Sequence, residues 1–143
     1  MLSVGAIGPD LSELSGLRAE SEQLGYRMLQ RLEEGWRSGA NRFDKPGEAL
    51  FGAWQDHRLV GVCGRNRDLF DSHPRAGRVR HLYVAATARG NGVGRALVGL
   101  IVDGAGQWFD YLNTNAPPEA ARFYERLGFL PVVGERVTHR LPL

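Results

Sequence analysis

The sequence of 143 residues contains one cysteine, Cys63, and one lysine, Lys45. A single thiol excludes an intramolecular disulfide and a cysteine-based zinc cluster, which predicts a reducing compartment, the cytoplasm. Cys63 lies in the apolar run Leu59–Cys63, and this position favours a buried structural thiol over a nucleophile. No apolar run approaches the ~18 residues of a membrane span, and the N-terminus lacks the basic and apolar regions of a signal peptide. We therefore expect no membrane association.

An excess of charge of one sign is also missing. Eighteen basic residues stand against 16 acidic ones, which leaves a net charge of +2. So small a surplus, spread along the chain, disfavours a nucleic-acid-binding protein but permits a local anion site. Glycine is abundant: 19 of the 143 residues are glycine, a larger share than the usual ~7%. This abundance indicates tight turns or close backbone contacts. The length and the 43% hydrophobic content predict one globular domain over residues 1–143.

Hydrophobic periodicity and turn residues predict alternating strands and helices. Expected strands cover residues 2–7, 49–54, 59–63, 79–84, 108–112, 129–133 and 136–141. Four helices are expected. The first follows a capping box at Asp10 and Glu13, and the second runs from Leu24 to about Arg37, with Gly39 as the stop. The third covers residues 93–105, and the fourth runs from Pro118 to Leu127 and ends at Gly128. This order mixes hairpins with strand–helix–strand crossovers. It predicts an α/β (α+β) fold with a mixed, mostly antiparallel central sheet and helices on both faces.

The segment Leu82–Leu97 predicts a phosphate-binding turn. A strand is followed by Gly90, Gly92 and Gly94 and then by a helix. Glycines let an anion approach the free N–H groups of a helix N-terminus, and Arg89 and Arg95 flank the turn. A P-loop is excluded because no Lys followed by Ser or Thr opens the helix. A dinucleotide fingerprint is excluded because the last position of each possible frame is Arg95 or Leu97.

Two separated motifs resemble those of the GNAT acyltransferase superfamily. Arg89-x-x-Gly92-x-Gly94 resembles the R/Q-x-x-G-x-G/A signature, and Leu82-Tyr83-Val84 resembles the strand before it. Ala120 to Phe129 resembles the A-x-x-x-Y-x-x-x-G-F segment. Leu112-Asn113-Thr114 is similar to the end of the family's fifth strand. The resemblance is detailed from Val79 to Val133 and topological before that.

The resemblance implies an acetyl-CoA-dependent N-acetyltransferase with splayed fourth and fifth strands and no metal. The acetyl group would pass to a primary amine by direct attack in a ternary complex. An amide of Tyr83 or Val84 would polarise the thioester carbonyl. The implied coenzyme-binding residues are Leu82, Tyr83, Val84, Arg89, Gly90, Asn91, Gly92, Val93, Gly94, Arg95, Asn115 and Phe123. The alternative is a non-catalytic module of the same fold that binds or senses acyl-CoA.

Tyr124 matches the family's general acid, which protonates the leaving thiolate, although its helical spacing also suits a core aromatic. His81 is a weak candidate for the general base, with a structural role as the other interpretation. Strand alternation places His81 and Tyr83 on one face, and Arg80, Leu82 and Val84 on the other. Asn113 or Asn115 either bonds to the pantetheine arm or caps the helix at Pro118.

The acceptor is predicted only as a small-molecule or peptide amine. Acidic side chains on the early helices and loop would attract a cationic amine, or lie on a solvated surface: Glu20, Glu22, Glu33, Glu34 and Asp44. The aromatic residues Trp36, Phe43 and Trp54 would line an apolar pocket or belong to the core. No nucleic-acid or membrane partner is expected, and both a monomer and a homodimer are open.

Overall fold

A computed structural model describes the whole chain, residues 1–143. The strands are β1 (Leu2–Ala6), β2 (Ala49–Gln55), β3 (Arg58–Arg67), β4 (Ala76–Val84), β5 (Tyr111–Thr114), β6 (Leu130–Gly134) and β7 (Val137–Pro142). The α-helices are α1 (Leu14–Gln23), α2 (Met28–Ser38), α3 (Val93–Val102) and α4 (Ala121–Arg126). Short 3₁₀ turns are η1 (Ala86–Ala88), η2 (Ala105–Gln107) and η3 (Pro118–Ala120).

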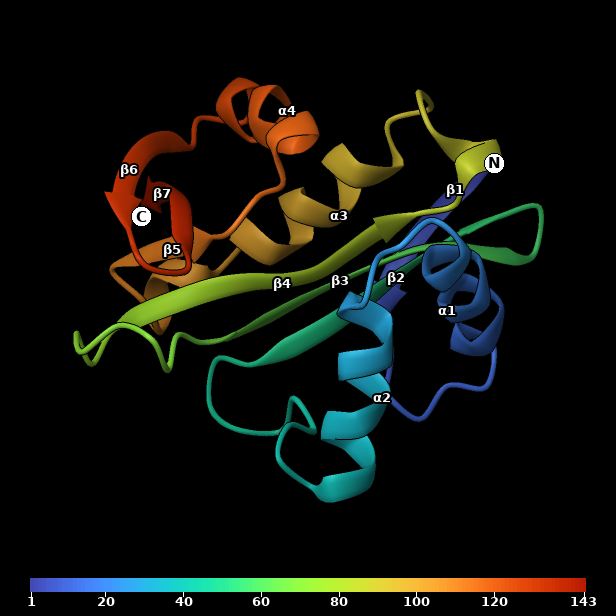
Figure 1. Cartoon of the computed structure of the whole chain (residues 1–143), viewed down its shortest axis with the longest axis horizontal. Helices are drawn as coiled ribbons and strands as arrows, with labels where there is room; N and C mark the ends of the chain where they lie inside the picture. Colours follow the sequence, from blue (N-terminus) through green and yellow to red (C-terminus); the bar gives the residue numbers. More distant parts are fainter.

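All seven strands form one sheet in the order β1-β2-β3-β4-β5-β7-β6. Neighbouring strands are antiparallel except β4 and β5, which are parallel. Helices α1 and α2 cover one face of the sheet, and α3 and α4 lie on the other (Figure 1). The predicted α/β (α+β) class, with a mixed, mostly antiparallel sheet between two helical layers, is confirmed.

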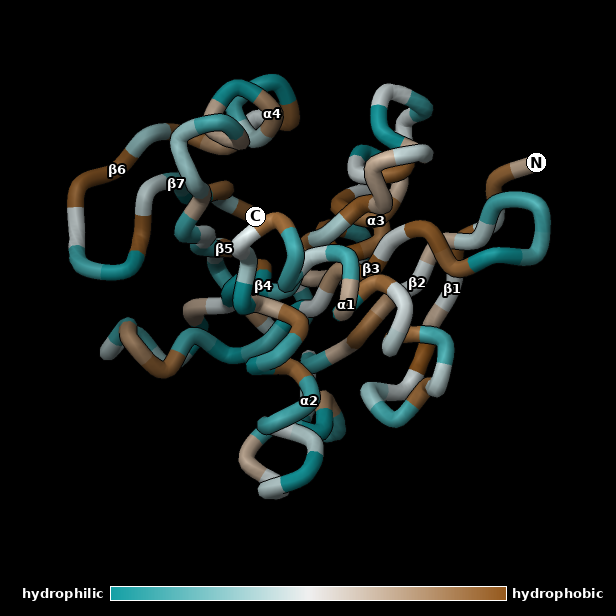
Figure 2. Tube along the Cα trace, turned by 45° about the vertical axis from the view of Figure 1, so that its right-hand side comes forward, coloured by the Kyte–Doolittle hydropathy of each residue, from teal (hydrophilic) through white to brown (hydrophobic).

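The core lies between the sheet and these helices. Its largest fully buried apolar side chains come from β2, β3, α3, β5 and the start of the last hairpin: Leu50, Val62, Leu97, Ile101, Leu112 and Phe129. In the hydropathy-coloured trace the central strands and α3 contain many apolar segments, and the β2–β3 and β6–β7 turns are hydrophilic (Figure 2). Cys63 is also fully buried, and burial raises the pKa of its thiol. The predicted structural role of Cys63 follows, because a buried thiol is not a nucleophile.

The fourth and fifth strands separate along their length, as predicted. Pairing of β4 with β5 is limited to Ala76–Arg78 opposite Tyr111–Asn113. Beyond Arg78, residues Val79–Val84 of β4 have no strand partner on the β5 side. The sheet is thus open at its centre, with an unpaired strand edge facing the gap.

A β-bulge interrupts β4 within this open stretch. Val62 pairs with Tyr83 and Gly64 pairs with Arg80, so His81 and Leu82 together face the single residue Cys63. His81 has φ 62°, a left-handed conformation that non-glycine residues rarely adopt. The extra residue changes the predicted alternation. Arg80 now shares the α1/α2 face with Tyr83, whereas simple alternation had placed it on the opposite face.

The predicted helix start at Leu24 is wrong, and the difference shapes the site. Gly25, at φ 86°, ends α1 with a Schellman motif. The amide of Tyr26 donates to the carbonyl of Ser21, and that of Gly25 donates to the carbonyl of Glu22. Helix α2 starts only at Met28. Tyr26 consequently lies in the turn between the two helices.

Other boundaries also differ from the prediction: β3 continues to Arg67 instead of Cys63, and β4 begins at Ala76 instead of Val79. Asp10 precedes α1 in a turn, and α1 begins at Leu14 with no side-chain cap, so the expected capping box is absent. Helix α3 ends at Val102 because Asp103 adopts an extended conformation, and Gly104, at φ 71°, precedes the next turn. Trp108 belongs to the end of the 3₁₀ turn that follows, since its amide donates to the Ala105 carbonyl. Strand β5 therefore covers Tyr111–Thr114 and does not start at Trp108 as predicted.

Candidate active site

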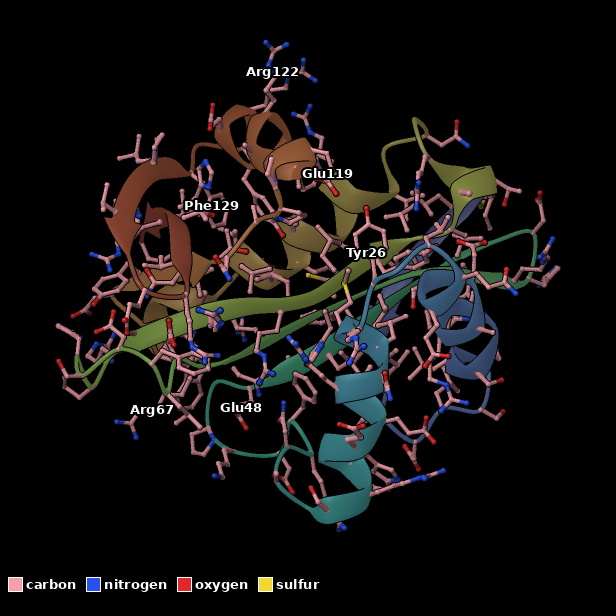
Figure 3. All side chains as sticks on the ribbon, in the orientation of Figure 1. Tyr26, Glu48, Arg67, Glu119, Arg122 and Phe129 are labelled. Atoms are coloured by element: carbon pink, nitrogen blue, oxygen red, sulfur yellow. The ribbon has the colours of Figure 1, made fainter.

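The gap between β4 and the segment after β5 is a cleft of about 640 Å³. Its walls come from the α1–α2 turn, the open stretch of β4, residues 114–117, η3, α4 and the β6–β7 turn. Figure 3 shows Tyr26 and Glu119 facing each other from two of these walls. The Tyr26 hydroxyl donates to Glu119 Oε1 at 2.9 Å. This bond joins η3 to the α1–α2 turn across the cleft.

The glycine turn before α3 forms a second, smaller hollow of about 380 Å³. Gly90 and Gly92 have φ 83° and 78°, values that favour glycine. The first hydrogen bond of α3 runs from the Ala96 amide to the Gly92 carbonyl, so the amides of Val93, Gly94 and Arg95 have no partner within the helix. The chain therefore presents free N–H groups and the positive end of a helix dipole to this hollow.

Val84 and Arg89 line both the cleft and the hollow, so the two spaces adjoin. Arg89 Nε donates to the Val84 carbonyl at 3.1 Å, and the guanidinium lies 5.7 Å from the ring centre of Tyr83. The Arg89 side chain thus covers the last carbonyl of the open strand. An elongated ligand with an anionic end has a continuous path from the hollow into the cleft.

The structure brings together most of the predicted coenzyme-binding residues. Those that line the cleft are Leu82, Tyr83, Val84, Arg89 and Asn115. Those that line the hollow are Val84, Arg89, Gly90, Gly92, Val93, Gly94, Arg95 and Phe123. Asn91 is exposed and lines neither space.

The two asparagines of the β5 end have separate environments. Asn113 is buried, donates to Asp68 and Asp71, and accepts from Arg140. It is therefore committed to structure. Asn115 is exposed on the cleft wall. The alternative that an asparagine caps the following helix is wrong, because Pro117 occupies the cap position of η3 without a side-chain bond.

Tyr124 of α4 lies in the cleft wall and is buried. Its ring contacts Phe123 and Phe129 edge-on and stacks on His139. Burial raises the pKa of Tyr124 above its ordinary value, and a side-chain hydrogen bond with Thr114 lowers it. The phenol is thus fixed in one orientation and holds its proton at neutral pH.

Two further tyrosines line the cleft, and each hydroxyl is bonded to a carboxylate. Tyr83 donates to Glu20, which also accepts from the Ala86 amide at 3.1 Å. Burial and Glu20 raise the pKa of Tyr83 to about 12. Tyr26 donates to Glu119, and this bond raises the pKa of Tyr26. Tyr124 differs from both because its bond is with a neutral partner, Thr114.

His81 lies in the cleft wall but is almost fully buried, so it is not poised there as a base. Its Nδ1 lies 2.8 Å from the Met28 carbonyl, which assigns the proton to Nδ1. Nε2 is buried without a hydrogen-bond partner. Burial, followed by the charge of Arg80, lowers the pKa of His81 to about 3. A group with this pKa is neutral at pH 7 and a weak proton acceptor.

We expect His81 to make the free energy of unfolding depend on pH. The unfolded chain binds a proton at this residue below about pH 6.5, whereas the native protein does so only near pH 3. Stability is therefore complete above pH 6.5 and falls on acidification, by at most about 1.4 kcal/mol per pH unit. Urea unfolding at pH 7, 5.5 and 4.5 measures this slope.

His81→Asn is the matched control for this slope. Asparagine tolerates the left-handed backbone, retains a donor for the Met28 carbonyl, and does not titrate. Subtracting its slope from that of the wild type removes the contribution of the carboxylates. Identical slopes for the two proteins would contradict the lowered pKa of His81.

The acidic residues expected to attract the acceptor do not line the cleft. Glu22, Glu34 and Asp44 are exposed, and Glu33 pairs with Arg18 and Arg37. Phe43 is buried in the core, and Trp36 and Trp54 lie outside the cleft.

Sequence reasoning missed several residues that do line the cleft: Tyr26, Arg31, Phe70, Arg78, Glu119 and Arg136. The available signal was Arg78 and Arg80 within an otherwise apolar strand.

Comparison with known proteins gives a family match. A family model described as the acetyltransferase (GNAT) domain matches residues 46–131, more than half of the chain. No curated protein matches the sequence.

No helix of the structure is both long and apolar enough to cross a membrane.

Solved structures share the fold over almost the whole chain. A protein of Exiguobacterium sp. 255-15 assigned as an acetyltransferase is 29% identical, with a TM-score of 0.87 over 99% of this chain and 93% of that one. Ribosomal-protein-alanine N-acetyltransferase of Brucella melitensis is 18% identical, with a TM-score of 0.73 over 99% of both chains. N-acetylglutamate synthase of Neisseria gonorrhoeae, solved with coenzyme A and N-acetyl-glutamate, is 18% identical, with a TM-score of 0.67 over 98% of this chain and 34% of that one.

Proposed function

The chain belongs to the GNAT acetyltransferase family, and from this premise we propose that it transfers an acetyl group from acetyl-CoA to a primary amine. The observation that carries the proposal is the junction of two spaces at Val84 and Arg89. A hollow lined by glycines and free helix amides opens there into a cleft that contains a buried phenol. The hollow and the cleft together suit an acetyl donor molecule with an anionic end and a reactive end. The Neisseria relative solved with coenzyme A adds support.

The donor's diphosphate lies in the hollow, against the amides of Val93, Gly94 and Arg95. The amides of its pantetheine arm pair with the open edge of β4, Val79–Val84, as an added strand would. Asn115, on the opposite wall, offers a side-chain amide to the same arm. An amide of Tyr83 or Val84 then donates to the thioester carbonyl and stabilises the negative charge that develops there.

Transfer is direct, in a ternary complex. The neutral amine attacks the thioester carbon, a C–N bond forms, and the C–S bond breaks. Tyr124 gives its proton to the departing sulfur. Burial favours this protonation, because it destabilises a thiolate as it does at Cys63. The pKa of His81 makes that residue too weak a base, so water in the cleft takes the amine proton.

Binding and chemistry are tested separately. At a concentration 100 times its Kd, acetyl-CoA is expected to raise the free energy of unfolding by about 2.7 kcal/mol. Urea unfolding with and without acetyl-CoA measures this gain, and ATP and NAD serve as control ligands. Thiol release in the presence of an amine panel then measures transfer. Stabilisation without thiol release from any amine would support a non-catalytic acyl-CoA sensor, and stabilisation by ATP or NAD alone would refute the proposal.

A further inference from the structure

The cleft wall is strongly cationic on the side away from the glycine turn. Four arginines line it there: Arg31 of α2, Arg78 and Arg80 of β4, and Arg136 of the β6–β7 turn. Glu119 is the only carboxylate among the lining residues, and it already accepts a hydrogen bond from Tyr26. The potential of this part of the cleft is therefore positive, and it favours an anion over a second cation.

Arg78 has a structural role that accounts for its position. Its side chain is largely buried, lies 3.5 Å from Asp68 Oδ2, and donates to the Arg136 carbonyl at 2.6 Å. It also lies over the ring of Phe70, with the guanidinium carbon 5.0 Å from the ring centre. These contacts tie β4 to the β6–β7 turn, so Arg78 needs no ligand.

Arg80 has no such partner. It is half-buried, no carboxylate lies within 4.0 Å of its guanidinium, and its side chain donates no hydrogen bond. Burial and the charges of Arg78 and Arg31 lower the pKa of Arg80. The protein therefore leaves the five N–H donors of this half-buried guanidinium unused, and they are available to a bound oxyanion.

Arg31 and Arg136 are also free of carboxylate partners. Both are exposed to the cleft from elements on either side of β4. Arg136 lies over Phe70, with its guanidinium carbon 4.6 Å from the ring centre. Together with Arg80 they leave three unpaired guanidinium groups around one space. Neutral His81 beneath them adds no charge of either sign at pH 7.

These arginines do not belong to the diphosphate hollow, which none of them lines. Arg80 precedes Val84 by four residues, a separation of roughly 13 Å along a strand. The register also places Arg80 on the face covered by α1 and α2, whereas α3 packs on the opposite face. The cleft thus carries a second cationic region, separated from the first by the length of the open strand.

From this arrangement we propose that the acceptor is an amine that also bears an oxyanion, a carboxylate or a phosphate, which Arg80 binds with help from Arg31 and Arg136. The proposal rests on the proposed function, since the acceptor shares the cleft with Tyr124. It differs from the sequence-based alternative in which acidic residues attract a cationic amine. The planar fork of Arg80 can bind such a group through two parallel hydrogen bonds.

The test uses matched pairs of amines with the protein saturated with coenzyme A, which fills the diphosphate hollow first. Phosphoethanolamine is compared with ethanolamine, and β-alanine with its amide. Calorimetry gives the Kd of each amine, and thiol release from acetyl-CoA gives kcat/KM. We expect the oxyanion-bearing member of at least one pair to bind at least tenfold more tightly than its partner that lacks the oxyanion. The two pairs distinguish a phosphate from a carboxylate.

Arg80→Gln is expected to weaken binding of the anionic amine by about tenfold or more. Arg80→Lys should retain part of the affinity, because the charge stays and the fork is lost. Arg58→Gln is the control, since it makes the same charge change at the exposed first residue of β3, outside both spaces. It should leave the Kd of each amine unchanged. Urea unfolding confirms that each variant is folded.

Amines with an oxyanion that bind no better than their partners without one, or that bind equally well to Arg80→Gln, would overturn the inference. Efficient acetylation of the partners without an oxyanion would do the same while leaving the proposed function intact. Conversely, Arg80-dependent binding of an anionic amine without thiol release would uphold the anion site and count against the proposed function.

Discussion

Tyr124→Phe is expected to lower kcat by about 100-fold, the effect of losing a positioned general acid. The Kd for acetyl-CoA should stay nearly unchanged, because the phenol reaches the sulfur and not the diphosphate hollow. The ring contacts with Phe123, Phe129 and His139 survive in the variant. Removal of the buried hydroxyl should change the free energy of unfolding by about 1 kcal/mol or less. Steady-state kinetics and urea unfolding measure the two effects.

Three matched variants locate the acid. Tyr111→Phe removes a hydroxyl that donates to Asp71 at 2.8 Å, outside the cleft, so it should lower stability by a similar amount and leave kcat unchanged. Tyr26→Phe and Tyr83→Phe remove the other two phenols of the cleft, whose protons are held by Glu119 and Glu20. Each should affect kcat less than Tyr124→Phe does. Unaltered turnover in Tyr124→Phe would remove Tyr124 from the mechanism.

Element order could be predicted from the sequence because each strand and helix has its own hydrophobic period. Two helix ends failed because the backbone leaves the helical conformation while the apolar spacing continues. Gly25, at φ 86°, ends α1, and the extended Asp103 ends α3. The β-bulge at His81 could not be predicted either, since it arises from pairing between β3 and β4. The extra residue of this bulge places Arg80 on the face of the sheet that lines the cleft.

The glycine turn was predictable because all its parts are local in sequence: a strand end, three glycines and a helix start. The cleft was not predictable, because its walls come from α2, β4, η3 and the β6–β7 turn. Arg31 and Arg136 are 105 residues apart in the chain and reach one space only through the sheet order. Acidic residues on the early helices seemed suited to an amine, but helix packing turns Glu33 toward Arg18 and Arg37.

Gly94→Leu is expected to abolish most of the stabilisation by acetyl-CoA. A Cβ at position 94 would lie 3.1 Å from Cζ of Phe123 and 3.2 Å from its Cε1, so the side chain must project into the hollow or displace the ring. Either outcome blocks the approach of a diphosphate to the amides of Val93 and Arg95. A hundredfold loss of affinity would reduce the 2.7 kcal/mol gain to about 0.4 kcal/mol at the same ligand concentration.

Gly99→Leu is the matched control, because it makes the same change one and a half turns further along α3. No atom lies within 4 Å of the Cβ that this change adds, and Gly99 lines neither space. Leucine in place of glycine within a helix should stabilise the free protein by up to about 0.8 kcal/mol. The gain on adding acetyl-CoA should nevertheless match the wild type. If Gly94→Leu kept the full gain as well, the diphosphate would have to bind elsewhere, and the free amides of α3 would lose their assigned role.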